Sequence, residues 1–252
     1  MAERFRHAEI LELARSEGQV SVDDLARRFR ISVQTVRKDL AELSEQGALT
    51  RVHGGALLPR RLSNIAYEER RALKAEAKTQ IAAACAAHVP ENATVFLNIG
   101  TTTEAVARAL LSHRDLMVVT NNLNIANILA ANPNCNVLVT GGLLRRSDGG
   151  LMGTMTTQVI ANFKFDLAVI GCSALDKDGD ILDFDIEEVG VSQTIIRQSR
   201  HVILAADSSK FDRTAPVRIG NLRDVNRFIT DGPLPGDLAR QLEQSGTVVE
   251  LG

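Results

Sequence analysis

The sequence predicts a two-part α/β protein, in which a small helical module precedes a larger domain built on a parallel sheet. Short helix-forming segments separated by turns fill the first part of the chain. From Ala93 onward, short runs of Val, Ile and Leu alternate with helical patterns, which is typical of strands covered on both faces by helices. With 252 residues and 44% hydrophobic composition, the chain can bury a substantial core.

The charge of the chain limits how it can contact nucleic acid. The formal net charge is -2, which excludes a uniformly basic nucleic-acid binder. Residues 1–62 carry 11 Lys and Arg against 9 Asp and Glu, so a locally basic face can form there. The N-terminus lacks the apolar core of a signal peptide, and no apolar run reaches the roughly 18 residues of a membrane span. We therefore expect a cytoplasmic protein with no membrane partner.

Three helices are expected in the N-terminal module. The first covers residues 6–14, and Gly18 ends it. Ser21 can cap a second helix that runs to about Phe29, because a serine hydroxyl accepts from free amides at a helix start. After a short turn, Ser32 can cap a third helix with one apolar face. The residues of that face are Val33, Val36, Leu40 and Leu43.

The start of the third helix carries polar residues that would face outward. Together with the capping serine, these are Ser32, Gln34, Thr35, Arg37 and Lys38. Such residues on a recognition helix reach base edges in the major groove, where Gln and Arg form bidentate hydrogen bonds. Residues 48–52 are predicted to be a strand leading into a β-wing, on which Arg51 and His53 are candidate DNA contacts. The alternative is a helical interaction module whose exposed charges are merely solvated.

Two motifs of the module occur in the order expected for a known family. Residues 32–40, SVQTVRKDL, followed by residues 53–56, HGGA, resemble the DNA-binding signature of the DeoR family of bacterial sugar-metabolism regulators. The resemblance implies a winged helix-turn-helix over residues 1–58 that binds operator DNA and represses transcription. In that setting we expect Asp39 to be a structural partner of nearby basic groups rather than a base reader.

The rest of the chain is expected to be a linker over residues 59–73 and an α/β domain over residues 74–252. The linker contains Pro59 and a basic pair but no sustained apolar period. Strands are predicted over residues 94–99, 117–120, 137–140, 167–170, 202–206 and 228–230. A helix is predicted from near residue 74 to residue 85, and further helices over residues 103–111, 123–130, 154–162, 187–199 and 237–244.

Polar turns follow the predicted strands, and ligands of open parallel sheets bind outside the carboxyl ends of the strands. The first turn contains Gly100, Thr101 and Thr102, whose amides and hydroxyls could cradle a phosphate. Another turn carries Lys210, which could neutralise a phosphate. The other candidate effector-binding residues are Asn121, Asn122, Gly141, Gly142, Asp148 and Asp207. Gly and Asn favour turns for conformational reasons alone, so only their convergence at one edge points to a ligand.

This domain resembles the DeoR effector domain, whose fold is related to ribose-5-phosphate isomerase. The resemblance implies a sensor of phosphorylated sugars or related metabolites. Within the family, the resemblance to one subgroup is carried by motifs at residues 98–102, 120–127, 146–150 and 199–202. That resemblance implies glycerol 3-phosphate as the effector, with a different sugar phosphate as the alternative. We expect the domain to form a homodimer or homotetramer, because a symmetric oligomer matches repeated or palindromic half-sites.

The turn after the fourth predicted strand separates a regulator from an enzyme. Many family members carry an acid there, whereas this chain has Ser173, a poor general base without an activating partner. We therefore assign no catalytic residue, and an isomerase with an accessory DNA-binding domain is the rival hypothesis. An acidic group lies at the start of the predicted helix over 187–199, where the helix dipole favours acids. Its members are Asp183, Asp185, Glu187 and Glu188, and we assign neither a metal nor a cofactor.

Overall fold

The computed structural model describes residues 2–17, 19–45, 48–52, 54–57, 63–236 and 238–252. The chain divides into two compact units, Met1–Ala66 and Tyr67–Gly252, and this division falls inside the segment expected to be a linker. Much of that segment forms helix α4, Ser63–Ala72, which the sequence pattern did not predict.

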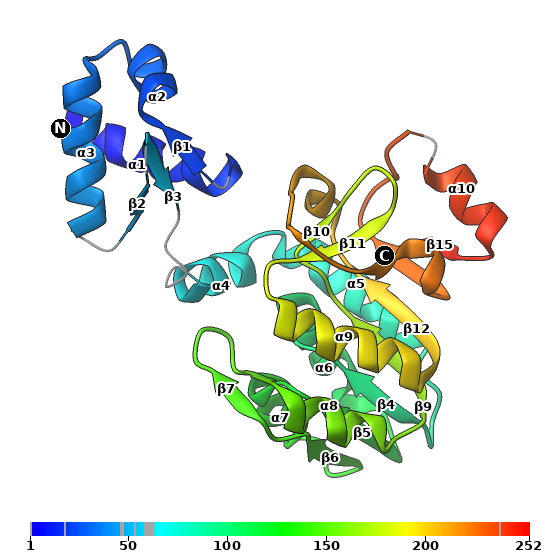
Figure 1. Ribbon diagram of the computed structural model, residues 1–252. Coiled ribbons are helices and arrows are strands. Elements are labelled where there is room, and N and C mark those ends of the chain that lie inside the picture. The colour runs from blue at the N-terminus through cyan, green and yellow to red at the C-terminus, as the bar shows by residue number, and fades with distance from the viewer. Residues whose placement is uncertain (1, 18, 46–47, 53, 58–62, 237) are drawn as a thin grey trace. The chain divides into compact units, whose positions relative to one another are not determined.

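The N-terminal unit is a helix-turn-helix with a small antiparallel sheet (Figure 1). Its helices are α1 (Ala2–Glu17), α2 (Val22–Phe29) and α3 (Val33–Glu45), and its strands are β1 (Gln19–Ser21), β2 (Thr50–Val52) and β3 (Gly55–Leu57). The strands pair in the order β1-β3-β2. One core cluster joins Ile10 of α1, Leu25 of α2 and Leu40 of α3. The three expected helices and the wing are confirmed, and β1 is an addition.

Capping explains where α2 and α3 begin. Ser21 Oγ accepts a hydrogen bond from the backbone N of Asp24 at 3.0 Å. Ser32 Oγ accepts from the backbone N of Thr35 at 3.1 Å. Both serines therefore satisfy amides that have no partner within the helix, as the sequence predicted. Gly18, the expected end of the first helix, lies outside the described residues.

The second unit is built on a seven-stranded parallel sheet of order β15-β14-β12-β9-β4-β5-β6. Its strands are β4 (Thr94–Leu97), β5 (Leu116–Thr120), β6 (Cys135–Val139), β9 (Phe165–Ile170), β12 (Ser199–Ala205), β14 (Arg227–Thr230) and β15 (Val248–Leu251). Every strand predicted from the sequence is confirmed, with small shifts at the ends. The additional strand, β15, forms one edge of the sheet.

Helices cover both faces of this sheet (Figure 1). One layer contains α5 (Ala75–Ala87), α6 (Thr101–Ala109) and α7 (Leu123–Leu129), and the other contains α8 (Thr154–Ala161), α9 (Ile186–Gln198) and α10 (Leu238–Ser245). Side chains of β4 alternate between the two cores, with Val95 and Leu97 in the first and Phe96 in the second. None of the helices in the described ranges combines the length and apolar character that crossing a membrane requires.

Short elements beside the main sheet were not predicted. They are the hairpin β7 (Leu143–Arg145) and β8 (Gly150–Met152), the antiparallel strands β10 (Ala174–Leu175), β11 (Asp180–Asp183) and β13 (Val217–Asn221), and the 3-10 helices η2 (Leu110–Ser112), η3 (Ser208–Asp212) and η4 (Leu222–Asp224). Most of them span only two or three residues, which is too few to show a hydrophobic period. Several of them follow strands of the main sheet directly in the chain, as β7 follows β6 and η3 follows β12.

Candidate nucleic-acid interface and effector site

Helix α3 buries one face and presents a polar face. Val36, Leu40 and Leu43 belong to the core of the N-terminal unit. Of the candidate DNA contacts on this segment, Ser32, Gln34, Arg37 and Lys38 are exposed and Thr35 is half-buried. Ser32 Oγ and Thr35 Oγ1 lie 2.9 Å apart, so the start of the helix is held by side chains as well as by its backbone. The predicted outward orientation is confirmed, and contact with DNA stays a prediction.

Asp39 fixes α3 against α1. Its side chain is only 1% exposed, and its carboxylate accepts from Arg6 Nε at 2.6 Å and from Arg6 Nη2 at 2.8 Å. His7 Nε2 lies 3.3 Å from the same carboxylate. Burial opposes ionisation, but hydrogen bonds and charge from Arg6 and His7 hold the pKa of Asp39 below its usual range. The expected role of Asp39 as a structural partner is confirmed.

The wing depends on a glycine where two strands come close. A Cβ atom at Gly55 would lie 2.0 Å from the carbonyl oxygen of Val20 in β1, so only glycine fits there. Gly54 before it has a φ of 80°, in the left-handed region. Arg51 on β2 is exposed, whereas His53 lies outside the described residues.

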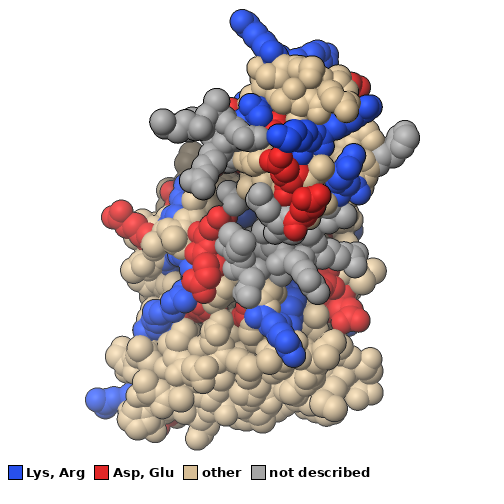
Figure 2. All heavy atoms as spheres, turned by 90° about the vertical axis from the view of Figure 1, so that its left-hand side faces the viewer, with Lys and Arg blue, Asp and Glu red and all other residues tan. Residues whose placement is uncertain are grey.

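Cations gather on this unit. Figure 2 shows Lys and Arg side chains over the upper part of the view, where the N-terminal unit lies. Exposed cations from α2, α3 and the wing are Arg27, Arg28, Arg37, Lys38 and Arg51. Arg27 pairs with Asp24 and Lys38 with Glu42, so the basic face that the charge distribution predicted stays a prediction, supported by these exposed cations.

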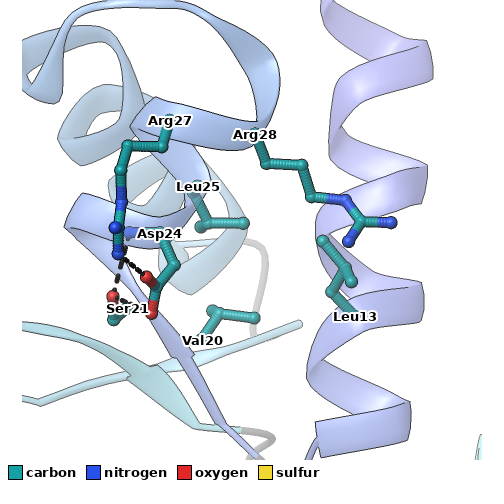
Figure 3. Close-up of a pocket in the computed structure, with 7 residues that line it drawn as sticks. All are labelled: Leu13, Val20, Ser21, Asp24, Leu25, Arg27 and Arg28. Carbon is teal, nitrogen blue, oxygen red and sulfur yellow. Dashed lines mark hydrogen bonds and ion pairs between the residues drawn. The ribbon is translucent and has the colours of Figure 1, made fainter.

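A hollow between α1 and α2 also lies on this unit (Figure 3). Ser21 Oγ donates to Asp24 Oδ2 at 2.7 Å, and Arg27 pairs with the same aspartate. Arg28 extends from α2 toward Leu13 of α1 (Figure 3). The hollow is lined by this helix cap with its Arg27 partner, by the aliphatic side chains of Leu13, Val20 and Leu25, and by Arg28.

The candidate effector site lies at the carboxyl edge of the main sheet. Gly100 is the N-cap of α6, with a φ of 139° and no side-chain cap. Its carbonyl accepts from Thr103 Oγ1 at 2.8 Å, and Thr102 is buried. The next strand in the sheet leads to Asn121 and Asn122, so the first two predicted turns are neighbours. A helix start without a side-chain cap leaves amides available to an anion.

Two asparagines at this edge have buried polar atoms in need of partners. Asn122 Oδ1 accepts from the backbone N of Asn124 at 2.7 Å and so caps α7, and Asn121 Nδ2 donates to Leu151 O at 3.2 Å. Their other amide atoms, Asn121 Oδ1 and Asn122 Nδ2, make no hydrogen bond with the described residues. Leaving a buried polar group unpaired costs about 1–3 kcal/mol. Hydroxyl groups of a ligand can satisfy such atoms.

Arg145 organises acidic side chains beside these turns, and sequence reasoning missed it. Its guanidinium donates to both oxygens of Asp148, at 2.9 and 2.6 Å, and to Glu188 Oε2 at 2.6 Å. Burial and the charge of Asp183 raise the pKa of Glu188 to about 7, against the attraction of Arg145. Because both oxygens of Asp148 are occupied, its predicted effector contact is less direct than that of the asparagines. Asp185 also faces Arg145, at 3.7 Å.

Lys210 is a buried cation in η3. It is 9% exposed, and its ammonium makes no hydrogen bond or salt bridge with the residues that the structure describes. Burial and the charges of Arg213 and Arg70 lower the pKa of Lys210. Asp207 caps η3, since its Oδ1 accepts from the backbone N of Ser209 at 3.1 Å. Asp207 therefore shapes the turn, and its negative charge also acts on Lys210 and favours the protonated lysine.

Gly141 and Gly142 have a packing role that needs no ligand. Gly141 O accepts from Thr156 Oγ1 at 2.8 Å. A Cβ atom at Gly142 would lie 2.1 Å from that same Thr156 oxygen and 2.6 Å from Met152 O. These glycines let the end of β6 pass close to α8. Their role as effector contacts stays a prediction.

Helix α4 is tied to the effector edge by a buried polar network. Tyr67 Oη donates to Glu104 Oε1, and Asn124 Nδ2 donates to Tyr67 Oη at 2.7 Å and to Glu104 Oε1 at 3.0 Å. Asn124 Nδ2 also lies 3.0 Å from Asp148 O. Glu104 belongs to α6, which starts at Gly100, so the network spans α4 and three of the predicted effector turns.

Lys78 of α5 binds carbonyl groups at the end of the same helix. Lys78 Nζ donates to Arg70 O and, at 2.7 Å, to Leu73 O, which are carbonyls at the end of α4. Burial lowers the pKa of Lys78 to about 8. Tyr67 and Lys78 together hold the part of α4 that belongs to the second unit against α5 and α6. Sequence reasoning missed both residues, because their partners lie far along the chain or on the backbone.

Tyr67 is the single tyrosine of a chain without tryptophan, so its ionisation can be observed directly. Burial and the hydrogen bond to Glu104 raise the pKa of Tyr67. A phenol with a raised pKa stabilises the fold below about pH 10, and this contribution is lost as pH rises further. We expect the ultraviolet signal of tyrosinate to stay absent through pH 10 and to appear only with unfolding. A normal titration of the folded protein near pH 10 would contradict the network.

A winged helix joined to a parallel-sheet sensor defines a class of protein, the ligand-responsive transcriptional regulators. Residues 6–61 match the DeoR-like helix-turn-helix domain, and residues 73–232 match the DeoR C terminal sensor domain. The chain belongs to the DeoR family.

Named relatives extend over the full chain. It is 42% identical over 251 residues to the glycerol-3-phosphate regulon repressor of Escherichia coli strain K12, covering 100% of both chains. The glycerol-3-phosphate regulon repressor of Haemophilus influenzae is 41% identical over 251 residues, covering 100% of this chain and 98% of the relative. Among solved structures, ribose 5 phosphate isomerase A from Neisseria gonorrhoeae has 15% identity and a TM-score of 0.38 over 56% of this chain and 55% of that chain.

Proposed function

We propose that this protein is a cytoplasmic repressor of a carbon-metabolism operon, released from its operator by a phosphorylated metabolite, with glycerol 3-phosphate as the first candidate. The observation that supports this most directly is that one chain combines a helix face with exposed Gln34, Arg37 and Lys38 and a sheet edge where buried polar groups lack partners among the described residues. The relatives described above are named as repressors, which supports a regulator rather than an enzyme.

The operator would be read by α3 and held by the wing. Gln34 and Arg37 project from the first turns of the helix, where base edges of the major groove come within reach. The other predicted contacts on this face are Ser32, Thr35 and Lys38. Arg51 on the wing would contact the phosphate backbone, as would His53. A homodimer or homotetramer would place two such faces on repeated half-sites.

The effector would bind across the turns at the sheet edge. Its phosphate would meet the uncapped start of α6 at Gly100 to Thr102 and the ammonium of Lys210, while its hydroxyls would meet Asn121 Oδ1 and Asn122 Nδ2. Strands β4 and β12 are separated by β9 alone, so their carboxyl ends lie about 10 Å apart, given a strand spacing of about 4.8 Å. The side chain of Lys210 is long enough to cover part of this distance. A three-carbon phosphate then has to span only the remainder.

Release requires that the effector prefer the state with low operator affinity. The Tyr67 contacts with Glu104 and Asn124 connect α4 directly to the effector turns, and Lys78 holds the end of α4 to α5. A shift of α6 or α7 on binding would therefore move the helix that leads to the DNA-binding unit. Regulation then needs no catalysis, and we propose that the sensor unit carries out none.

The test is titration of labelled promoter DNA at fixed salt, with and without glycerol 3-phosphate and a panel of sugar phosphates. We expect Arg37→Ala to weaken specific binding about 10- to 100-fold, because it removes a bidentate contact to a base. The matched control, Lys177→Ala, removes an exposed cation of the sensor unit and should leave operator affinity unchanged.

Glycerol 3-phosphate should weaken operator binding and raise the thermal stability of the protein. Failure of every DNA to bind specifically would reject the repressor. A potent sugar phosphate beside an inactive glycerol 3-phosphate would reject only the effector. Turnover of a pentose phosphate would instead favour the isomerase rival.

A further inference from the structure

One stretch of the sensor unit is almost free of charge. Residues 116–163 contain three charged residues, Arg145, Arg146 and Asp148, among 48, whereas charged residues make up 24% of the whole chain. Arg145 and Asp148 bind each other, which leaves Arg146 as the exposed charge of this stretch. Solvent-facing surfaces of monomeric proteins normally carry many charges of both signs. This stretch therefore has the composition of a covered surface.

Large apolar side chains are exposed within it. They are Val139 at the end of β6, Leu143 and Leu144 on β7, and Met155 on α8, with exposed fractions of 38%, 69%, 44% and 62%. A Cβ at Gly141 would lie 3.6 Å from Met155 Sδ, which brings α8 next to the chain between Val139 and Leu143. We call these four side chains, with strand β6, the β6 surface. Figure 2 shows a broad uncharged region at the height at which β6, β7 and α7 lie in Figure 1.

Strand β6 adds an unprotected sheet edge. It pairs with β5 alone and is the last strand of the described main sheet. Charged residues and prolines usually prevent an edge strand from pairing with another chain. The sequence of β6, CNVLV, contains neither. An apolar edge with free backbone groups is suited to accept a further strand.

We propose that the β6 surface is where a second copy of this chain binds, with the two β6 strands facing each other across a two-fold axis. A two-fold interface brings a surface against itself, so like charges would repel, and a surface nearly free of charge avoids that penalty. An acidic or basic partner would find no complementary charge here. The inference rests on the proposed function for its occupant, since a repressor that reads symmetric half-sites needs a second copy.

The test is sedimentation of the full chain over a range of concentrations in the absence of DNA. The wild type should assemble above its chain mass of 27.3 kDa. Leu143→Glu should weaken self-association at least about 100-fold, because a two-fold interface contains every substituted residue twice. Met155→Glu, on a different element, should do the same and guards against a folding defect in the first variant. Circular dichroism of both variants should match the wild type.

The matched control is Leu251→Glu, which adds the same charge at a side chain 64% exposed on β15, at the opposite edge of the same sheet. It should keep the wild-type mass. A wild type that stays monomeric, or folded β6-surface variants with the wild-type mass, would overturn the inference. Dissociated variants should still bind a single half-site weakly. Loss of all DNA binding by an intact assembly would instead count against the proposed repressor.

Discussion

Replacing Asp39 with alanine is expected to destabilise the N-terminal unit by about 3 kcal/mol, the lower end of the range for breaking a buried ion pair. The substitution leaves Arg6 and His7 without the carboxylate that joins α1 to α3. Because Arg6 is 18% exposed, water can partly replace the lost partner. A unit of this size has only a few kcal/mol of stability to lose, on the order of 5 kcal/mol. Operator binding should fall with it.

Calorimetry and limited proteolysis should show this loss in the N-terminal unit, with the sensor unit unchanged. The pKa of Asp39 is lowered in the folded state, so its contribution is complete above about pH 4 and is lost as pH falls through the folded pKa. The difference between Asp39→Ala and the wild type should therefore shrink in acid. A variant as stable as the wild type at pH 7 would show that the Arg6 pair contributes nothing.

Replacing Lys210 with methionine is expected to weaken effector binding about 10- to 100-fold, because a charged hydrogen bond to phosphate is lost. Operator affinity without effector should stay the same. The folded protein should be at least as stable, since Lys210 is a buried cation with no salt bridge to the described residues and methionine removes the cost of burying it. Calorimetric titration with glycerol 3-phosphate and operator titration check both outcomes.

The pH dependence gives a second measure of the same site. The pKa of Lys210 is lowered, and phosphate prefers the charged lysine, so effector affinity should fall as pH rises through that pKa. The methionine variant should lose this dependence. Lys177→Met is the control, because Lys177 is exposed on the turn between β10 and β11. A fully responsive Lys210→Met protein would remove Lys210 from the effector site.

Much of the fold could be predicted because its signals are local. The caps at Ser21 and Ser32, the apolar face of α3 and the apolar runs of the parallel strands each depend on residues close in sequence. The polar turns after β4 and β5 were found for the same reason. Asp39 could be assigned a structural role from its place in a motif, but its partners Arg6 and His7 came only from the structure.

Other features lacked a local signal. Helix α4 has no clear apolar face in the sequence, and it is held by Tyr67 and Lys78 through contacts with other elements. Arg145 reaches Glu188 across 43 positions of the chain. The glycines at 141 and 142 looked like ligand turns, but the structure shows a close approach to Thr156 that explains them without a ligand.

The sequence by itself determined that this protein is a winged helix followed by a parallel-sheet domain, because periodicity, capping and turn chemistry depend on neighbouring residues. The sensor role of that domain came from the family resemblance. Only the tertiary structure decided which buried groups meet at the sheet edge, how α4 is tied to them, and that β6 is left as an open apolar edge. These features depend on packing between distant segments, and no local pattern records which segments will meet.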